Sequence, residues 1–372
     1  MSKLFQPIRV GETELGHRVV MAPLSRMRAN YHVTLPMVKE YYVQRCSTPG
    51  TLIISEATAI SPGAGAYRYS PGIWSPEQTS ACKEITDAVH ANGCKMYCQL
   101  WHLGRSGQSD TLAMFGRKLK APSAIRIESD FGEFQVPEEL NEQEIWETIA
   151  EYARAARNAV ENAGFDGVEI HGANGYLPDQ FLQDVSNKRS DSWGGSVENR
   201  SRLHIEVTKA VVEAIGPQRT GRVPNKPSIR LSPHSEFLSM GMKNPMPQFS
   251  HVVSELKQMG LSYLHLVEWR ISGHSDTDVR PGNTNDPLIE IWNNTSPVIL
   301  AGSFTPASAR EAVDKMYKDS DVMIAFGRHF IANPDFVYRL EAELPLNKYD
   351  RPTFYLPLSE KGYLDYPVWQ GT

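Results

Sequence analysis

No stretch of this sequence stays apolar for the roughly 20 residues that a helix needs to cross a bilayer. The N-terminal residues, MSKLFQP, lack the long apolar core of a secretory signal peptide. Basic residues are not in excess, because the formal net charge of the 372 residues is −5. A broad basic field that would attract nucleic acid or an anionic membrane is therefore not expected. We expect a cytoplasmic protein whose sites for anionic ligands are local.

Cysteine is scarce, with four residues at positions 46, 82, 94 and 98. Cys94 and Cys98 are separated by three residues, but no second cysteine pair or histidine cluster completes a zinc pattern. Cys98 lies in a strand-like run. We expect reduced structural thiols in a reducing compartment, and no metal site.

What the sequence does contain is an ordinary globular balance, 41% hydrophobic and 22% charged, which can bury a large core. Short apolar runs recur along it, and near-continuous hydrophobicity is typical of strands covered on both faces. Amphipathic segments that repeat at helical spacing lie between them, at 142–163, 207–215 and 307–316. The eight apolar runs span residues 18–23, 51–58, 95–101, 167–173, 228–233, 262–268, 297–302 and 322–327.

Eight strands alternating with helices predict an α/β fold, a single (β/α)8 TIM barrel spanning residues 1–372. An open doubly wound sheet is the alternative, and the lack of a GxGxxG motif after the first strand weakens it. Residues 1–16 are expected to form an N-terminal hairpin cap. Residues 104–141, after the third strand, are too long for an ordinary loop and are expected to form an insertion or lid. Residues 345–372 form a C-terminal extension, and a monomer or homodimer is expected.

The fourth predicted strand ends in polar residues, where a barrel of this class places its active site. His171 and Asn174 follow each other closely enough for both to donate to one oxygen, which would polarise a carbonyl group. Tyr176 follows and could deliver a proton. The alternative is that His171 and Asn174 cap the next turn and that Tyr176 packs in the core. Spacing alone does not separate these two interpretations.

The run HGANGYL at 171–177, with QFL at 180–182, resembles the strand-four signature of the old yellow enzyme family. The run RSDSWGGSVENR at 189–200 resembles that family's next block, and the similarity extends from Leu4 to Pro367. The resemblance implies an FMN-dependent enzyme of the fungal type. It also implies that His171 and Asn174 bind the electron-withdrawing group of the substrate and that Tyr176 is the proton donor.

The same resemblance implies which residues bind FMN. Ser25 would reach flavin O4, where the family commonly has threonine, Gln99 the pyrimidine edge, and Arg230 the region of N1. Local pattern alone also allows Ser25 to be a helix cap, Gln99 a buried bridge between strands, and Arg230 a structural ion pair. The loops after strands seven and eight suit a phosphate. The full predicted cofactor set is Pro23, Ser25, Ala57, Gln99, Arg230, Gly302, Ser303, Gly327 and Arg328.

Three aromatic residues, Tyr67, Trp101 and Tyr355, are expected to shape the substrate pocket, although aromatic residues in loops can simply pack. His102 with Gly104-Arg105 departs from many relatives that have this tryptophan, and its role stays open.

The implied function is reduction of an activated C=C bond, such as that of an α,β-unsaturated carbonyl compound. In a ping-pong cycle, NADPH or NADH gives hydride to FMN and leaves, and the alkene then takes its place. Two alternatives are an isomerase of a secondary-metabolite pathway without net redox and a non-catalytic protein that binds FMN or phenols. Loss of the tyrosine accompanies the isomerase activity, so Tyr176 favours reduction.

Overall fold

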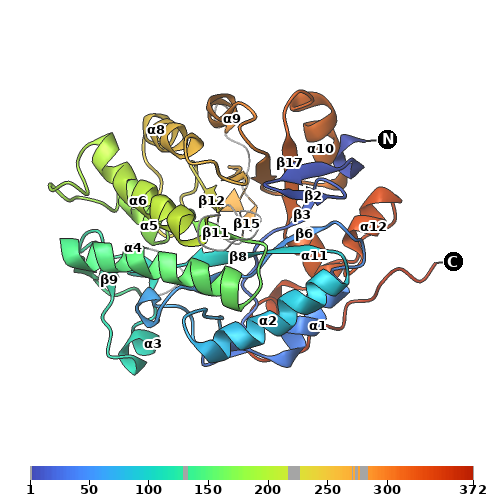
Figure 1. Cartoon of the computed structure of the whole chain (residues 1–372), viewed down its shortest axis with the longest axis horizontal. Helices are drawn as coiled ribbons and strands as arrows, with labels where there is room; N and C mark the ends of the chain where they lie inside the picture. The colour runs from blue at the N-terminus through green and yellow to red at the C-terminus, as the bar shows by residue number, and fades with distance from the viewer. Residues whose placement is uncertain are drawn as a thin grey trace.

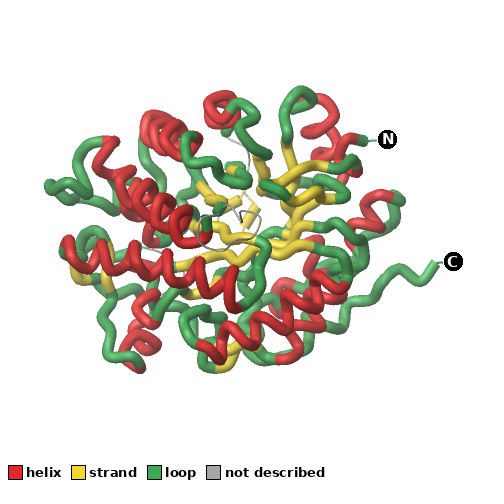
Figure 2. Tube along the Cα trace, viewed as in Figure 1, coloured by secondary structure: helices red, strands yellow, loops and turns green. Residues whose placement is uncertain are grey.

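Eight parallel strands form a closed barrel at the centre of the molecule (Figures 1 and 2). The computed structural model describes residues 2–128, 133–216, 227–269 and 284–371, and the backbone alone at 271–272 and 275–276. The barrel strands are β3 (Val19–Met21), β6 (Leu52–Ile54), β8 (Lys95–Trp101), β11 (Gly167–His171), β12 (Ser228–Leu231), β13 (Leu264–Val267), β16 (Val298–Ala301) and β17 (Val322–Phe326).

The barrel closes because β17 pairs with β3, while each other strand pairs in parallel with the next barrel strand along the chain. A short extra strand, β7 (Thr58–Ala59), also pairs with β8. Each observed barrel strand lies within one of the eight predicted runs. The (β/α)8 prediction is confirmed, and the open-sheet alternative is wrong.

Helices follow the strands in sequence and surround the barrel, as Figure 2 shows in red around the yellow strands. Each strand presents its outer residues to them, which explains why the strands are apolar on both faces. The surrounding helices are α1 (Pro36–Gln44), α2 (Pro76–Ala91), α4 (Glu142–Arg157), α6 (Val197–Ile215), α8 (Met246–Lys257), α9 (Asp286–Trp292), α10 (Pro306–Glu311) and α12 (Phe336–Glu341).

Helix starts follow local capping chemistry. Asn141 caps α4, accepting a hydrogen bond from the Glu144 backbone N–H at 2.9 Å. Ser196 caps α6 in the same way, so this helix begins ten residues before the predicted start at 207. The predicted helix over 142–163 ends as an α-helix at Arg157 and continues as a π-helical turn, Asn158–Asn162. A matching turn, Ala312–Met316, continues α10.

The N-terminal segment forms an antiparallel hairpin of β1 (Ile8–Val10) and β2 (Thr13–Leu15). Its apolar side chains belong to one cluster with residues that point into the barrel. This cluster fills the barrel interior at the hairpin end and leaves the other end free for polar residues. Its members are Ile8, Val10, Leu15, Val20, Ala22, Leu52, Ile54, Tyr97, Tyr263, Ile299, Ala301, Met323 and Ala325.

The segment after β8 has structure of its own. It contains α3 (Ser109–Met114) and two short parallel strands, β9 (Lys120–Ala121) and β10 (Glu138–Glu139). Two short helices, α5 (Leu177–Leu182) and α11 (Arg328–Ala332), directly follow β11 and β17. In the part of the chain that the structure describes, no helix combines the length and the apolar character needed to span a membrane.

The C-terminal segment is tied to the loop after β3 by two buried arginines. The Arg26 guanidinium donates to the carbonyls of Phe354 and Gly362 at 3.1 and 2.8 Å. Arg28 donates to Ser359 and again to Phe354, at 2.9 and 3.0 Å. Charge-assisted bonds to backbone carbonyls fix the course of a segment that has little regular structure.

A substitution at Gly50 tests how closely the N-terminal hairpin segment packs against this loop. The φ of Gly50 is +80°, and an added Cβ would lie 2.4 Å from Gly16 N. We expect Gly50→Ala to lower the free energy of unfolding by about 1–2 kcal/mol through backbone strain and by roughly 1–3 kcal/mol more through the clash. Gly116→Ala is the matched control, since Gly116 has φ +63° but no atom near its Cβ position. Urea unfolding should show the larger loss for Gly50→Ala. Equal losses would mean that the hairpin adjusts freely.

Candidate active site

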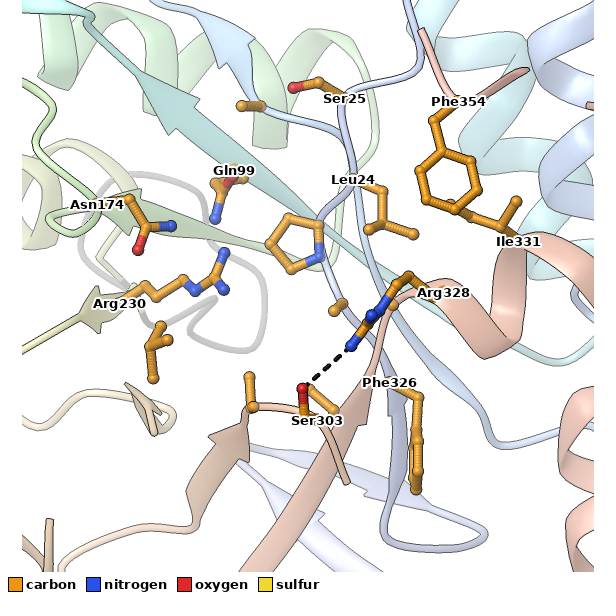
Figure 3. A pocket seen from close by; sticks show the side chains of 18 of the residues that line it. Leu24, Ser25, Gln99, Asn174, Arg230, Ser303, Phe326, Arg328, Ile331 and Phe354 are labelled. Carbon is orange, nitrogen blue, oxygen red and sulfur yellow. Dashed lines mark hydrogen bonds between the residues drawn. The ribbon is translucent and has the colours of Figure 1, made fainter. Parts of the chain in front are cut away.

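A cavity of about 730 Å³ opens at the carboxyl ends of the barrel strands (Figure 3). The residues that line it come from the ends of barrel strands, from the loops that follow them and from the C-terminal segment. All predicted site residues but one lie here: Pro23, Ser25, Ala57, Tyr67, Gln99, His171, Asn174, Tyr176, Arg230, Gly302, Ser303, Gly327, Arg328 and Tyr355.

Trp101 is the exception, because it lies behind the lining. It is 1% exposed, and its ring packs against those of Tyr176 and Tyr67, with centroids 5.1 and 5.5 Å away. Its contacts support two tyrosines that do reach the cavity. Among the described residues of the 104–141 insertion, none lines the cavity, so a lid role for this segment stays a prediction.

The turn after β11 brings the three predicted catalytic residues together. Asn174 and Gly175 are both left-handed, with φ of 57° and 75°. An added Cβ at Gly175 would lie 2.8 Å from Met240 Cγ, so glycine is needed here for space as well as for conformation. This tight turn directs Tyr176 back toward His171, and their ring centroids are 4.8 Å apart in an edge-to-face arrangement.

Buried side chains hold the backbone of this turn. The Asn174 N–H donates to Ser232 Oγ at 2.7 Å, and the Gly175 N–H donates to Asp179 Oδ2 at 2.8 Å. The Gln180 amide donates to the Gly175 carbonyl at 2.7 Å. Left-handed conformations of a non-glycine residue such as Asn174 persist only when the surroundings determine them.

The unassigned run His102–Arg105 is part of the same support. Gln180 also donates to the Leu103 carbonyl at 2.9 Å and accepts from the Arg105 backbone N–H at 3.0 Å. An added Cβ at Gly104 would lie 2.1 Å from Gln180 Oε1. Burial lowers the pKa of His102 to about 3, so its imidazole is neutral, and Nδ1 accepts from the Gly104 N–H at 3.1 Å. His102 is thus a structural residue of the loop after β8.

The electrostatics of the cavity suit binding of an oxygen atom. Burial, and then the positive charge of Arg230, holds the pKa of His171 well below its usual value, so the imidazole is neutral at neutral pH. Its Nδ1 has no hydrogen-bond partner although it is buried. Burial, and then the neighbouring Tyr67 and Tyr355, raises the pKa of Tyr176 well above 10, so its phenol is protonated.

Arg230 extends from β12 into the same space, and Figure 3 shows its guanidinium near Gln99 and Asn174. Its Nε is buried and without a partner. A buried donor without a partner is costly, so its presence in this side chain calls for an explanation. The Gln99 amide donates to Glu169 Oε1 at 2.7 Å and so links β8 to β11, one of the two roles expected for it. Gln99 also lines the cavity.

The opposite side of the cavity is built by the loops after β16 and β17. Arg328 donates to Ser303 Oγ at 3.0 Å, drawn as the dashed line in Figure 3, and to the Tyr349 hydroxyl at 3.2 Å. Gly302 has φ 146°, and an added Cβ would lie 2.6 Å from Glu268 Cβ. Glycine therefore lets this backbone approach closely, and the guanidinium stands beside it.

Sequence reasoning missed two groups of residues. The first lines the cavity from loops without a recognisable pattern: Met27, Phe237, Tyr349, Arg351 and Phe354. The second is a buried set around Glu169 beneath the cavity, which the sequence does signal. Glu169 is a charged residue in an otherwise apolar strand and precedes His171 by two, so both side chains point to the same face.

Asp179, which holds the turn, gives a pH test. Burial raises its pKa to about 7, although the Gln183 amide, the Gly175 N–H and Arg105 oppose the shift. The folded protein therefore keeps a proton that the unfolded chain releases near pH 4, and stability falls as pH rises from about 4 to about 7.

We expect Asp179→Asn, which resembles the protonated acid, to match the parent near pH 4 and to exceed its free energy of unfolding at pH 8 by on the order of 2 kcal/mol. Urea unfolding of the FMN-stripped proteins at several pH values measures this. The buried Glu56, whose pKa burial also raises to about 7, is unchanged in both and serves as the internal reference. Parallel pH curves would show that Asp179 is ionised in the folded protein.

Residues 3–347 match the family model described as the NADH:flavin oxidoreductase / NADH oxidase family. The chain is 51% identical to the NADP-dependent oxidoreductase lnbE of Aspergillus flavus, over 99% of this chain and 96% of that protein. It is 50% identical to a chanoclavine-I aldehyde reductase of Penicillium roqueforti, over 98% and 96%. It is also 46% identical to a probable inactive dehydrogenase of Claviceps fusiformis, over 99% and 95%.

Solved structures agree. The old yellow enzyme homologue from Zymomonas mobilis superposes with a TM-score of 0.88 at 38% identity, covering 99% of this chain and all of that one. Morphinone reductase in complex with tetrahydroNAD gives 0.87 at 36% identity, covering 100% and 98%.

FMN fits the residues of the cavity. Arg230, whose buried Nε has no partner in the protein, lines one side, and the glycine-lined backbone with Arg328 lies at the other. An anionic ring system and a phosphate need a cation each. The match over nearly the whole chain places this protein in the old yellow enzyme family as a fungal-type member, with FMN as its cofactor and a reduced nicotinamide dinucleotide as the hydride donor.

Proposed function

We propose that this protein is an ene-reductase, which reduces the C=C bond of an α,β-unsaturated carbonyl compound or a similarly activated alkene. The observation that carries the proposal is the convergence of a neutral imidazole, a primary amide and a protonated phenol on one cavity. These groups match the needs of alkene reduction, which are an activated acceptor oxygen and a proton for the α-carbon.

His171 and Asn174 bind the acceptor oxygen. Both are donors, and the imidazole stays neutral because burial disfavours its charged form. A neutral donor polarises the carbonyl group without transferring a proton to it. Negative charge that develops on the oxygen during reduction is stabilised by these two hydrogen bonds.

Tyr176 supplies the proton. The phenol donates from its hydroxyl to the α-carbon, and the resulting phenolate is stabilised by Arg230, whose charge acts to lower the pKa of Tyr176. Trp101 packs edge-to-face against the ring, and the Tyr67 hydroxyl interacts with that of Tyr176, so both hold the phenol in place. A single well-defined position of the phenol is what makes it an effective general acid.

Ser25, Gln99 and Arg230 would hold the ring system of FMN, and Ser303 and Arg328 its phosphate. The backbone would approach the cofactor closely at four further positions, Pro23, Ala57, Gly302 and Gly327. Bound there, FMN would supply the hydride chemistry that links a reduced nicotinamide to the β-carbon of the alkene. One cavity serves both nicotinamide and alkene in turn, consistent with the absence of a dinucleotide fingerprint in the sequence. The pocket side chains Tyr67 and Tyr355 then contact whichever partner is present.

Isomerisation without net redox is the second candidate, and relatives with probable inactive in their names make a non-catalytic binder the third. Tyr176 in the cavity favours reduction over both. Product mass separates them, because reduction adds two hydrogens, isomerisation adds none, and a binder gives no product. Steady NADPH consumption that depends on an added enone is the expected result.

The oxygen-binding pair can be tested with a para-substituted phenol, whose phenolate gives a long-wavelength absorbance with oxidised FMN in this family. We expect His171→Ala and Asn174→Ala each to abolish this absorbance, because the anion loses one of two donors inside the cavity. Tyr176→Phe is the matched control and should keep it. If both alanine variants bind the phenol like the parent protein, the two residues do not form the oxygen site.

Tyr176→Phe tests the proton donor, since it removes one hydroxyl and leaves the ring packing in place. We expect reduction by NADPH to keep a near-parental rate, because that half-reaction needs no proton from Tyr176. Reoxidation by an enone should slow by roughly 10²–10⁴-fold.

Nitroalkenes should be affected less in this variant, because their stabilised carbanion can wait for a proton from water. Rapid-mixing absorbance at the flavin band measures both half-reactions. Equal slowing of both would mean a damaged cavity, and unimpaired enone reduction would assign the proton to another donor.

A further inference from the structure

A buried acidic residue lies directly beneath the cavity. Glu169 is in β11, two residues before His171, and is 0% exposed. Three donors surround its carboxylate. Gln99 Nε2 lies 2.7 Å from Oε1, and the Tyr263 hydroxyl and His265 Nδ1 lie 3.0 and 2.8 Å from Oε2. A buried carboxylate with this many donors is stable as an anion.

Few of the side chains around Glu169 are charged. Burial opposes ionisation of Glu169, but His265, Arg230 and Gln99 outweigh it and lower the pKa of the carboxyl group, which is ionised at neutral pH. Burial lowers the pKa of His265, so its imidazole is a neutral donor to Glu169. Of the side chains just described, only Glu169 and Arg230 are charged.

Arg230 lies between this carboxylate and the cavity. Its neighbour in register on β11 is His171, two residues after Glu169 along the strand. The charge of Glu169 acts to raise the pKa of Arg230. The two charges are not a direct ion pair, since the contacts of Glu169 are with Gln99, Tyr263 and His265. A ligand in the cavity therefore experiences the guanidinium charge reduced by the carboxylate behind it.

We propose that Glu169 tunes the reduction potential of the bound FMN, by offsetting the charge of Arg230 and by fixing the orientation of the Gln99 amide. Reduced FMN carries a negative charge, which an uncompensated arginine would stabilise strongly. Glu169 limits that stabilisation and so keeps the reduced cofactor able to give hydride to an alkene. Glu169 touches neither substrate nor cofactor and is a positioning residue.

The orientation of Gln99 follows from the same carboxylate. An ionised carboxylate only accepts hydrogen bonds, so the amide must turn its NH₂ group toward Glu169. Its carbonyl oxygen is then the atom left for the cavity, which Gln99 lines. This fixes an acceptor where a ring N–H of the cofactor can donate.

Glu169→Gln in the FMN-loaded protein is the main test, because it removes the charge and nearly preserves the shape. We expect the potential of bound FMN to rise by at least about 30 mV, a tenfold tighter hold on the two-electron reduced state. Reduction by NADPH should become faster and reoxidation by an alkene slower. These opposite changes distinguish altered charge from a damaged cavity, which would slow both half-reactions.

Tyr263→Phe keeps the test informative if Glu169→Gln does not fold. It removes one donor from a carboxylate that stays charged, so the potential should fall, opposite to the change in Glu169→Gln. Tyr97→Phe is the matched control, because Tyr97 is also buried in the barrel, packs 5.4 Å from the Tyr263 ring, and bonds to Ser262 rather than to Glu169. Its potential should equal that of the parent protein.

An unchanged or lowered potential in a folded, yellow Glu169→Gln protein would overturn the proposal, as would the same potential in Tyr263→Phe and Tyr97→Phe. The inference rests on the proposed placement of FMN beside Arg230 and not on the identity of the alkene. A protein that shifts its potential as expected but reduces no alkene would therefore refute the proposed function alone.

Discussion

A positive charge that is half-buried at the carboxyl end of β12 is the constraint on which the cavity depends. Arg230 cannot sit in an apolar barrel unless something compensates it. Glu169 supplies an opposite charge below, His171 stays neutral beside it, and the arginine side chain lines the cavity. The apolar cluster that begins at the hairpin ends where this polar layer starts. The barrel interior is therefore apolar at the hairpin end and charged at the cavity end, and the position of Arg230 sets the boundary between the two.

Buried polar residues next to this charged region fix the turn after β11. Tyr176 and Asn174 owe their positions to a strained backbone, and the strain is held by Asp179, Gln180 and Ser232, none of which lines the cavity. Gln180 also joins this turn to the loop after β8. Two neighbouring barrel strands are thus joined at their carboxyl ends, so His171 on β11 and the turn after it keep their positions relative to Gln99 on β8.

The sequence predicted the barrel because each strand is a short apolar run between amphipathic helices. All but one of the predicted site residues lie at the cavity, because strand ends and family motifs coincide, as in HGANGYL. The sequence placed Trp101 in the lining, whereas Trp101 lies behind Tyr176, since spacing does not show which of two aromatic residues reaches a cavity. The start of α6 was not predicted correctly. Ser196, which caps this helix, lies within the run RSDSWGGSVENR, which we interpreted as a family motif and not as the start of a helix.

Phe354 and Tyr355 could not have been placed by any periodic pattern. They line the cavity because Arg26 and Arg28, near β3, bind carbonyls of a segment more than three hundred residues later. Such bonds use the backbone of the C-terminal segment and leave its side chains free to vary. His171 lies at the end of β11 and Asn174 in the turn held by Ser232 and Asp179, whereas the cavity wall that Phe354 and Tyr355 form comes from an irregular segment. Substrate preference can therefore change through that wall while the chemistry of the barrel rim stays fixed.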